Sequence, residues 1–204
     1  MRLKRTLDTG TIATDFDTLA KPVDFAELFG RTAPVELEIG SGKGTFLVQE
    51  AAVRPDTDFF GVEHMKKYAA YAADRCRRAG LTNVRTLGGD AVRFVLEHVP
   101  DASLRAVHIY HPDPWPKSRH HKRRIVREDM LRQYERVLEP GGELRIVTDH
   151  DGYAEWIAEV LKASVLTPIE YVPPTSAGEG ELVGTNFERK YRKRNDRRFH
   201  PFAL

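Results

Sequence analysis

The sequence predicts an α/β fold in which a mostly parallel sheet carries helices on both faces, and three observations predict it. Short apolar runs, typical of buried strands, alternate with amphipathic stretches, typical of helices. The alternation extends from residue 35 to residue 163, at the spacing of right-handed strand–helix–strand units. A glycine-rich turn, residues 40–44, follows the first of these strands and precedes a helix.

The strands are predicted in short segments whose apolar residues show no helical period. They cover residues 35–39, 59–63, 83–87, 104–110 and 144–147. The helices are predicted where apolar residues recur every three or four positions. They cover the stretch after Gly44 that carries Phe46, Leu47 and Ala51, then residues 66–79, 91–98, 127–138 and 152–163. Pro55, Gly80 and the Pro140–Gly142 turn stand where three of these helices are expected to end.

The chain of 204 residues suits a single domain with its own core. Residues 1–33 are polar and weakly patterned, and we interpret them as an N-terminal arm. Residues 34–204 are predicted to form one domain, in which a loop at 173–180 leads to a basic C-terminal tail.

Composition excludes several classes of protein. With 41% hydrophobic and 30% charged residues, the chain has the make-up of a globular protein, not a disordered one. It contains no apolar run long enough to cross a membrane, and its basic first residues lack the apolar stretch of a secretory signal. A single cysteine, Cys76, provides neither an internal disulfide nor a zinc cluster, and the histidines have no metal-ligand spacing. We therefore expect a cytoplasmic protein without a bound metal.

The net charge is only +2, but basic and acidic residues are concentrated in different parts of the chain. Residues 1–5, 117–127 and 185–204 together hold half of the 32 Lys and Arg residues, whereas the remainder of the chain is acidic overall. Concentrated basic charge of this kind favours binding of a polyanion such as a nucleic acid. The alternative is a solvated basic face followed by an irregular tail.

Acidic residues follow the predicted strands at the edge where ligands bind in parallel sheets. Gly40 and Gly42 allow a ligand to approach the backbone, while Glu38 beside them would repel a phosphate and favour a cation such as S-adenosylmethionine. Glu63 is suited to ribose hydroxyls and Asp90 to an adenine amino group. The alternative is that these acids are helix caps or solvated turn residues.

The fourth predicted strand ends in an unusually stiff segment, Pro112-Asp113-Pro114-Trp115-Pro116. Proline fixes the backbone torsion φ, so three prolines favour a fixed position for Asp113 and a stacking face on Trp115. The alternative is a rigid surface loop whose tryptophan belongs to the core.

Six segments, taken together, resemble the bacterial-type tRNA (guanine-N7)-methyltransferases from about residue 35 to residue 188. They are Leu37-Glu38-Ile39-Gly40-x-Gly42, Gly61-Val62-Glu63, Asp90-Ala91, Pro112-Asp113-Pro114-Trp115-x-Lys117-x-Arg119-His120-x-Lys122-Arg123-Arg124, Thr148-Asp149-x-x-x-Tyr153-Ala154 and Thr185-x-Phe187-Glu188. The glycine turn alone indicates only a methyltransferase, whereas the Pro-Asp-Pro-Trp segment followed by Lys-Arg-Arg is far more specific.

The resemblance implies a Rossmann-like class I S-adenosylmethionine-dependent methyltransferase fold and the transfer of a methyl group to N7 of a guanine in the tRNA variable loop. It implies S-adenosylmethionine as methyl donor, tRNA as partner and no metal. The residues that it assigns to the cofactor are Glu38, Gly40, Gly42, Glu63, Asp90 and Asp113, of which Asp113 is also the catalytic residue. Those that it assigns to the substrate are Lys117, Asp149, Thr185, Asn186, Phe187 and Glu188. The RNA-binding segment comprises Arg119, His120, His121, Lys122, Arg123 and Arg124.

Three other functions compete with this interpretation. A methyltransferase acting on an exocyclic amine of another RNA or DNA base is expected to carry two prolines between the acid and the aromatic residue, whereas this chain has only Pro114 there. A non-catalytic RNA-binding relative is disfavoured because all four predicted acids are present. A NAD-dependent oxidoreductase is disfavoured by Glu38 and by the spacing of the glycines. The oligomeric state, monomer or homodimer, stays open.

Overall fold

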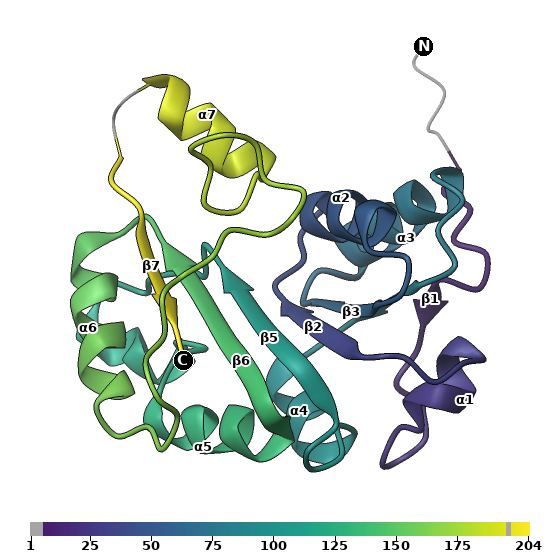
Figure 1. Cartoon of the computed structure of the whole chain (residues 1–204), viewed down its shortest axis with the longest axis horizontal. Helices are drawn as coiled ribbons and strands as arrows, with labels where there is room; N and C mark the ends of the chain where they lie inside the picture. Colours follow the sequence, from purple (N-terminus) through teal and green to yellow (C-terminus); the bar gives the residue numbers. More distant parts are fainter. Residues whose placement is uncertain (1–5, 195–196) are drawn as a thin grey trace.

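A seven-stranded sheet runs through the centre of the protein, whose computed structural model describes residues 6–194 and 197–204 (Figure 1). The strand order is β1-β4-β3-β2-β5-β6-β7, and only the β6–β7 pair is antiparallel. The strands are β1 (Ala13–Thr14), β2 (Val35–Ile39), β3 (Asp58–Glu63), β4 (Val84–Gly88), β5 (Leu104–Tyr110), β6 (Leu138–Thr148) and β7 (His200–Ala203). This is the sheet that the sequence predicts, with short strands added at both edges.

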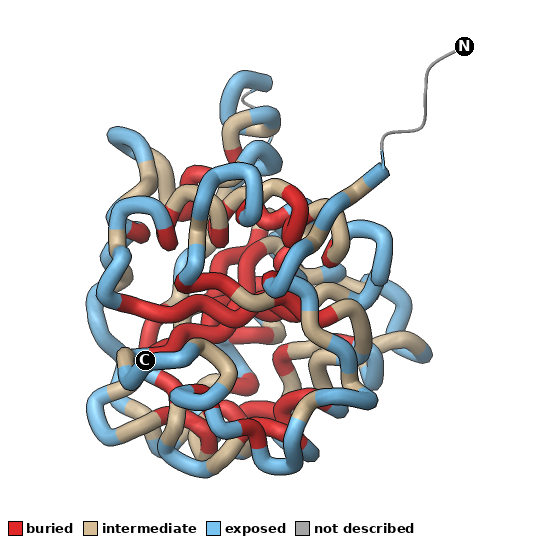
Figure 2. Tube along the Cα trace, turned by 90° about the vertical axis from the view of Figure 1, so that its right-hand side faces the viewer, coloured by how far each residue is buried: buried red, intermediate tan, exposed pale blue. Residues whose placement is uncertain are grey.

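Helices cover both faces of the sheet, which explains why the central strands are almost entirely buried (Figure 2). The helices are α1 (Phe25–Phe29), α2 (Thr45–Val53), α3 (Lys66–Arg78), α4 (Ala91–Glu97), the 3₁₀ helix η1 (Ser118–Arg123), α5 (Glu128–Val137), α6 (Asp151–Leu161) and α7 (Asn186–Arg194). Side chains of α2 and α3 pack into one apolar cluster, and those of α1, α4, α5 and α6 pack into a second.

The five strands and five helices predicted from the sequence are all present. Gly80 follows α3 with a φ of 71°, a left-handed conformation that glycine adopts without strain, so the predicted stop is confirmed. Cys76 is fully buried in the core, as its place on the α3 stripe predicts. The main difference is β6, which begins at Leu138 and not at residue 144, because Leu138 already pairs with Leu104.

The described segments near the two ends of the chain are more structured than their sequence patterns indicate. In the predicted arm, Ile12, Val23 and Phe25 are buried, and β1 extends the sheet beside β4. The predicted basic tail forms α7 and then β7, whose Ala203 and Leu204 are buried. The prediction for residues 1–5 lies outside the described residues, and the division of the chain at residue 33 stays a prediction. None of the helices in the described part has the length and apolar character needed to span a membrane.

Candidate functional site

The parallel strands end at one edge of the sheet, and this edge brings the predicted site residues together. A cavity of about 230 Å³ opens there. Its walls come from β2, the glycine turn, the start of α2, the end of β5 and the residues that begin α7. The lining residues are Glu38, Gly40, Ser41, Gly42, Lys43, Thr45, Phe46, Tyr110, His111, Thr185, Asn186 and Phe187.

Segments that lie nearly 150 residues apart in the chain, Glu38 and Thr185–Phe187, therefore face the same space. A larger cavity of about 440 Å³ lies beside α1 and the start of β2, at the opposite edge of the sheet. Its walls contain none of the predicted site residues, so we assign the site to the smaller cavity.

Glu38 is the most unusual group in this cavity. It is 4% exposed, and its Oε2 atom has no hydrogen-bond partner among the described residues. Burial and the negative charge of Glu63 raise the pKa of Glu38 to about 8. A carboxylate in this position gains stability from a cationic ligand, because the cation would supply the missing partner and favour the ionised form.

The glycine turn is held in place by Glu63. The Glu63 carboxylate accepts hydrogen bonds from the backbone amides of Gly42 and Met65, both at 2.9 Å. Gly44 adopts a φ of 67°, and a Cβ atom there would lie 2.7 Å from that of Ala72, so the close packing of the turn on α3 requires glycine. These contacts fix the turn that forms the floor of the cavity.

Asp90 caps α4 in this structure, as the alternative interpretation of the strand-end acids predicts. Its Oδ1 atom accepts from the amides of Val92 at 2.8 Å and Arg93 at 3.4 Å. Its side chain is exposed, and Oδ2 forms no hydrogen bond within the described part of the chain. The adenine contact predicted for Asp90 stays a prediction, and it is compatible with this cap because one oxygen is left for a ligand.

The Pro-Asp-Pro-Trp segment is rigid for reasons beyond its prolines. His111 and Trp115, which flank the segment, have φ values of 51° and 42°, in the left-handed region that non-glycine residues rarely adopt. Between them Asp113 is exposed to solvent. Trp115 is half-buried, not part of the core, and the guanidinium of Arg123 lies 4.9 Å from its ring.

Arg124 is a buried residue that holds the Pro-Asp-Pro-Trp segment in place. It is 4% exposed, its Nε atom donates to the Pro114 carbonyl at 2.9 Å, and its guanidinium lies 4.9 Å from the Tyr153 ring and 4.7 Å from the Trp156 ring. The charge of Arg124 is therefore used inside the protein. The RNA contact predicted for Arg124 stays a prediction, and this burial argues against it.

The remainder of the predicted RNA-binding segment divides into exposed and packed side chains. Lys117, Arg119, Lys122 and Arg123 are exposed around η1. His120 and His121 are half-buried, with their rings 5.6 Å from Trp115 and 5.2 Å from Trp156 respectively. The exposed cations are thus the members of this segment that are free to approach a phosphate.

The start of α7 closes the cavity from the opposite side. The Phe187 ring lies 4.7 Å from the His111 ring, and the Asn186 amide donates to Thr45 at 3.5 Å. Burial lowers the pKa of His111 to about 4, so its ring is neutral at pH 7, and neither ring nitrogen has a partner in the described structure. The cavity thus offers a second unpartnered polar group beside Glu38.

Glu188 is a buried residue that stabilises the turn before α7. It is fully buried, and it accepts from the amides of Leu182, Val183 and Gly184 at 2.7–2.9 Å and from Arg192 at 2.6 Å. Burial alone would raise the pKa of Glu188, but these hydrogen bonds lower it below its ordinary value. The substrate contact predicted for Glu188 stays a prediction, because both of its oxygens already hold the turn before α7.

Asp149, predicted to contact substrate, forms an ion pair with Arg197 through its Oδ2 atom. Arg197 also lies 3.9 Å from the Tyr191 ring, so the chain after α7 is attached to the end of β6. The Oδ1 atom of Asp149 has no hydrogen bond among the described residues. One oxygen of this carboxylate is therefore available to a ligand.

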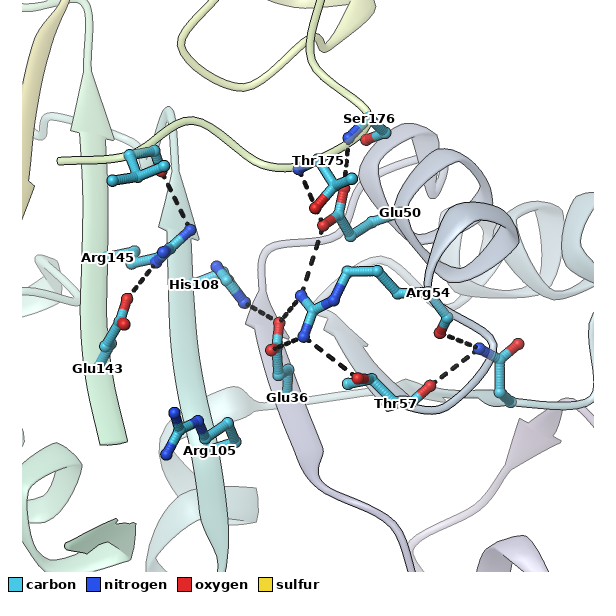
Figure 3. Close-up of polar contacts among 12 residues, drawn as sticks. Glu36, Glu50, Arg54, Thr57, Arg105, His108, Glu143, Arg145, Thr175 and Ser176 are labelled. Carbon is cyan, nitrogen blue, oxygen red and sulfur yellow. Dashed lines mark hydrogen bonds and ion pairs between the residues drawn. The ribbon is translucent and has the colours of Figure 1, made fainter. Parts of the chain in front are cut away.

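A buried polar network beneath the site was not predicted from the sequence (Figure 3). His108 Nε2 lies 2.8 Å from Glu36, and His108 Nδ1 lies 2.8 Å from the hydroxyl of Tyr110, which lines the cavity. Arg54 donates to both oxygens of Glu36 at 2.6 and 3.0 Å. Burial opposes ionisation of Glu36, but His108 and Arg54 outweigh it and lower the pKa of Glu36 to about 2.

The same network reaches the loop that leads to α7. The carboxylate of Glu50, which is also within 3.4 Å of Arg54, accepts from the backbone amides of Thr175 at 3.1 Å and Ser176 at 2.9 Å (Figure 3). A sequence signal for the network exists: Glu36 and His108 are polar residues in the interior of predicted strands. Such positions require a buried partner, but the sequence does not show which residue supplies it.

Comparison with known proteins agrees with this geometry. A family model described as "Putative methyltransferase" matches residues 32–200. An antibiotic-related methyltransferase has the same fold, with a TM-score of 0.63 and 17% identity, over 90% of this chain and 96% of the other. The 16S rRNA methyltransferase KamB also has it, with a TM-score of 0.61 and 19% identity, over 88% and 90%. The fold is that of the class I S-adenosylmethionine-dependent methyltransferases, and the family model makes this chain a methyltransferase.

Relatives in sequence narrow the class to one family. The tRNA (guanine-N(7)-)-methyltransferase of Halorhodospira halophila is 43% identical over 82% of this chain and 73% of its own length. The enzyme of the same name from Alkalilimnicola ehrlichii is 39% identical over 83% and 72%. The chain belongs to the tRNA (guanine-N7)-methyltransferase family, and the family resemblance expected from its motifs is confirmed.

Proposed function

We propose that this protein transfers the methyl group of S-adenosylmethionine to N7 of a guanine in the variable loop of tRNA, forming 7-methylguanosine. The observation that carries the proposal is the cavity in which Glu38 faces Thr185–Phe187, because it joins the cofactor and substrate segments of the family. The partner is tRNA, and we further propose that the protein acts in the cytoplasm as a monomer or homodimer.

The cavity fits the cofactor on chemical grounds. Glu38 provides an unpartnered buried carboxyl group for a cationic group, and the glycine turn allows close approach to the backbone. In this proposal Glu38, Gly40, Gly42, Glu63 and Asp90 hold S-adenosylmethionine, and Asp113 lies against it. When bound, the cofactor supplies an activated methyl group on a positively charged sulfur.

Methyl transfer to guanine N7 depends mainly on how the enzyme orients the base and the methyl group. N7 of guanine carries a free lone pair, so no general base is needed, and an in-line approach to the methyl group depends on positioning. Methylation places positive charge on the purine ring. The carboxylates of Asp113 and Asp149 are the groups of this chain that would stabilise that charge and accept the N1–H and N2–H₂ donors that distinguish guanine from adenine.

The surface around the site is suited to tRNA. Exposed Lys117, Arg119, Lys122 and Arg123 follow the Pro-Asp-Pro-Trp segment closely in the chain, and the first residues of the basic helix α7 (Figure 1) line the cavity. Phosphate contacts of this kind position an RNA without reading its sequence. The target guanine has to leave its stack to enter the cavity, where Phe187, which is 37% exposed, offers an aromatic face.

The test is to incubate the purified protein with isotopically labelled S-adenosylmethionine and unmodified tRNA, digest the RNA and identify the labelled nucleoside by mass spectrometry. We expect 7-methylguanosine. A label on an exocyclic amine would assign the protein to a different class of base methyltransferase. Binding of both ligands without any transfer would assign it to the non-catalytic relatives.

A further inference from the structure

Basic side chains that lack an acidic partner identify a surface that lies largely outside the sequence motifs. Outside residues 117–127 and 185–204, most described Lys and Arg side chains form ion pairs. Those without one, within the described ranges, are Lys43, Lys66, Lys67, Arg75, Arg85 and Arg132. Arg75 and Arg85 donate to backbone carbonyls instead. Three of the other four cations, all lysines, gather at the start of α3.

These three lysines surround two tyrosines, and we call the five residues Lys43, Lys66, Lys67, Tyr68 and Tyr71 the α3 patch. The Nζ atom of Lys43 lies 5.5 Å from the centre of the Tyr68 ring and 5.8 Å from that of the Tyr71 ring. The three lysines are exposed, and Tyr68 is 37% exposed. The patch therefore presents aromatic and cationic groups together.

The α3 patch lies next to the cavity, on the side opposite the basic run. Lys43 itself lines the cavity, and Lys66 packs on Gly88 at the end of β4. In the sheet, β3 and β4 lie on one side of β2, whereas β5, which leads to residues 117–124, lies on the other. An RNA whose target base enters the cavity can therefore meet positive charge on both sides of it.

Two acids close to the patch in sequence are bound elsewhere. Glu63 is bound to the amides of Gly42 and Met65. Asp74, one turn further along α3, is buried and paired with Arg78 at 3.0 Å. Three unpaired lysines beside a partly exposed tyrosine ring form the combination that binds unpaired nucleic acid, in which lysines contact phosphates and the ring stacks on a base.

We propose that the α3 patch is a second RNA-binding surface, at which Lys43, Lys66 and Lys67 contact the phosphates of a tRNA segment and Tyr68 stacks on an unpaired base. The proposal rests on the proposed function, since tRNA is the polyanion that the site receives. It extends the RNA contact from the basic run, across the cavity, to the side of the sheet formed by β3 and β4.

The first test compares two double variants that each remove two positive charges. Lys66→Gln with Lys67→Gln changes the patch, and Lys43 is left intact because it lines the cavity. Arg105→Gln with Arg132→Gln is the matched control, since Arg105 lies at the far end of β5 (Figure 3) and Arg132 is exposed on α5. The affinity for an unmodified tRNA transcript is measured by fluorescence anisotropy over a series of salt concentrations.

Loss of two phosphate contacts is expected to weaken tRNA binding about tenfold near physiological salt and to reduce the slope of log affinity against log salt by about 1.4 to 1.8. The control is expected to stay within about twofold of the wild type. Affinity for S-adenosylhomocysteine, measured by calorimetry, is expected to be unchanged in all proteins. A patch variant that binds tRNA as the control does, or that loses cofactor affinity instead, would overturn the inference.

The second test concerns stacking. Tyr68→Phe keeps the ring and is expected to bind tRNA as the wild type does, whereas Tyr68→Ala is expected to weaken binding severalfold. Equal affinities of the two variants would contradict a stacking role. The same measurements separate this inference from the proposed function. Patch-dependent tRNA binding without formation of 7-methylguanosine would refute only the function, whereas methylation with patch-independent binding would refute only the inference.

Discussion

Glu38 and Glu63 are neighbouring acids, and the negative charge of Glu63 disfavours ionisation of Glu38. Burial and the charge of Glu63 together raise the pKa of Glu38 to about 8, while Glu63 remains bound to the amides of Gly42 and Met65. The protein thus keeps Glu38 largely protonated at pH 7 until a cation enters. This arrangement makes cofactor binding measurable as a release of protons.

We expect binding of S-adenosylmethionine at pH 7 to release close to one proton from the wild-type protein, because the cation favours the ionised form of Glu38. Titration calorimetry in buffers of different ionisation enthalpy measures this release directly. In Glu38→Gln, which has no proton to lose at this position, the release is expected to disappear and the affinity to fall. Unchanged proton release in Glu38→Gln would show that the proton comes from elsewhere.

Glu38 and Glu36 are expected to give the cofactor-free protein opposite dependences of stability on pH. The folded pKa of Glu38, about 8, lies above the ordinary value of 4.5, so its contribution is complete below pH 4.5 and is lost as the pH rises through 8. The folded pKa of Glu36, about 2, lies below 4.5, so its contribution is present above pH 4.5 and is lost as the pH falls towards 2.

Glu38→Gln is therefore expected to be more stable than the wild type at pH 8, by up to about 4 kcal/mol, and to show a flatter profile from pH 5 to pH 8. Glu36→Gln is expected to be about 3 kcal/mol less stable at pH 7, because it breaks a buried ion pair. Denaturant unfolding of the three proteins as a function of pH measures both effects. Parallel profiles for Glu38→Gln and the wild type would contradict the raised pKa.

Asp113 is expected to matter for transfer and not for folding. It is exposed and held between two strained residues, His111 and Trp115, so Asp113→Ala should abolish methyl transfer while leaving the melting temperature within about 2 °C of the wild type. Single-turnover methylation and thermal unfolding measure the two properties. Glu155→Ala, which removes an exposed acid on α6, is the control. Near-normal turnover of Asp113→Ala would remove it from the catalytic residues.

The sequence was informative where local chemistry determines structure. The apolar residues of segments 35–39 and 104–110 predicted β2 and β5, and glycine with strand-end acids located the edge where the cavity lies. The sequence was less informative where long-range contacts decide. Helix α7 has few apolar positions, and the loop that leads to it is held by Glu50, which accepts from the backbone amides of Thr175 and Ser176, far away in the chain.

The residue types of the site could be predicted from the sequence, but the role of each residue could not. Arg123 and Arg124 are adjacent and identical in chemistry, yet one is exposed on Trp115 and the other is buried against Tyr153. Likewise Asp90 is an exposed helix cap, whereas Glu38 is buried with an oxygen that has no partner among the described residues. Burial and side-chain direction depend on packing from distant elements, and spacing along the chain does not reveal them.

Glu50 is expected to position the substrate segment through the loop at residues 173–180. Glu50→Ala removes the carboxylate that accepts from the backbone amides of Thr175 and Ser176 in two partly buried hydrogen bonds, which costs about 1–3 kcal/mol and loosens the chain that leads to Thr185. We expect the KM for tRNA to rise more than kcat falls. Glu50→Gln retains one acceptor oxygen and should recover part of the loss. Equal effects on both kinetic constants in the two variants would indicate a general loss of structure.

The last prediction separates the two adjacent arginines. Arg123 is exposed, so Arg123→Gln should lower the salt slope of tRNA binding by about 0.7–0.9 and leave the melting temperature unchanged. Arg124→Gln should do the reverse: the salt slope stays at the wild-type value, while the protein is destabilised and kcat falls, because the Pro114 carbonyl loses its donor and Asp113 its fixed position. Anisotropy and thermal unfolding, with single-turnover kinetics, distinguish the two. If Arg124→Gln changed the salt slope as much as Arg123→Gln does, Arg124 would have to reach the RNA, and the Pro-Asp-Pro-Trp segment would have to open when tRNA binds.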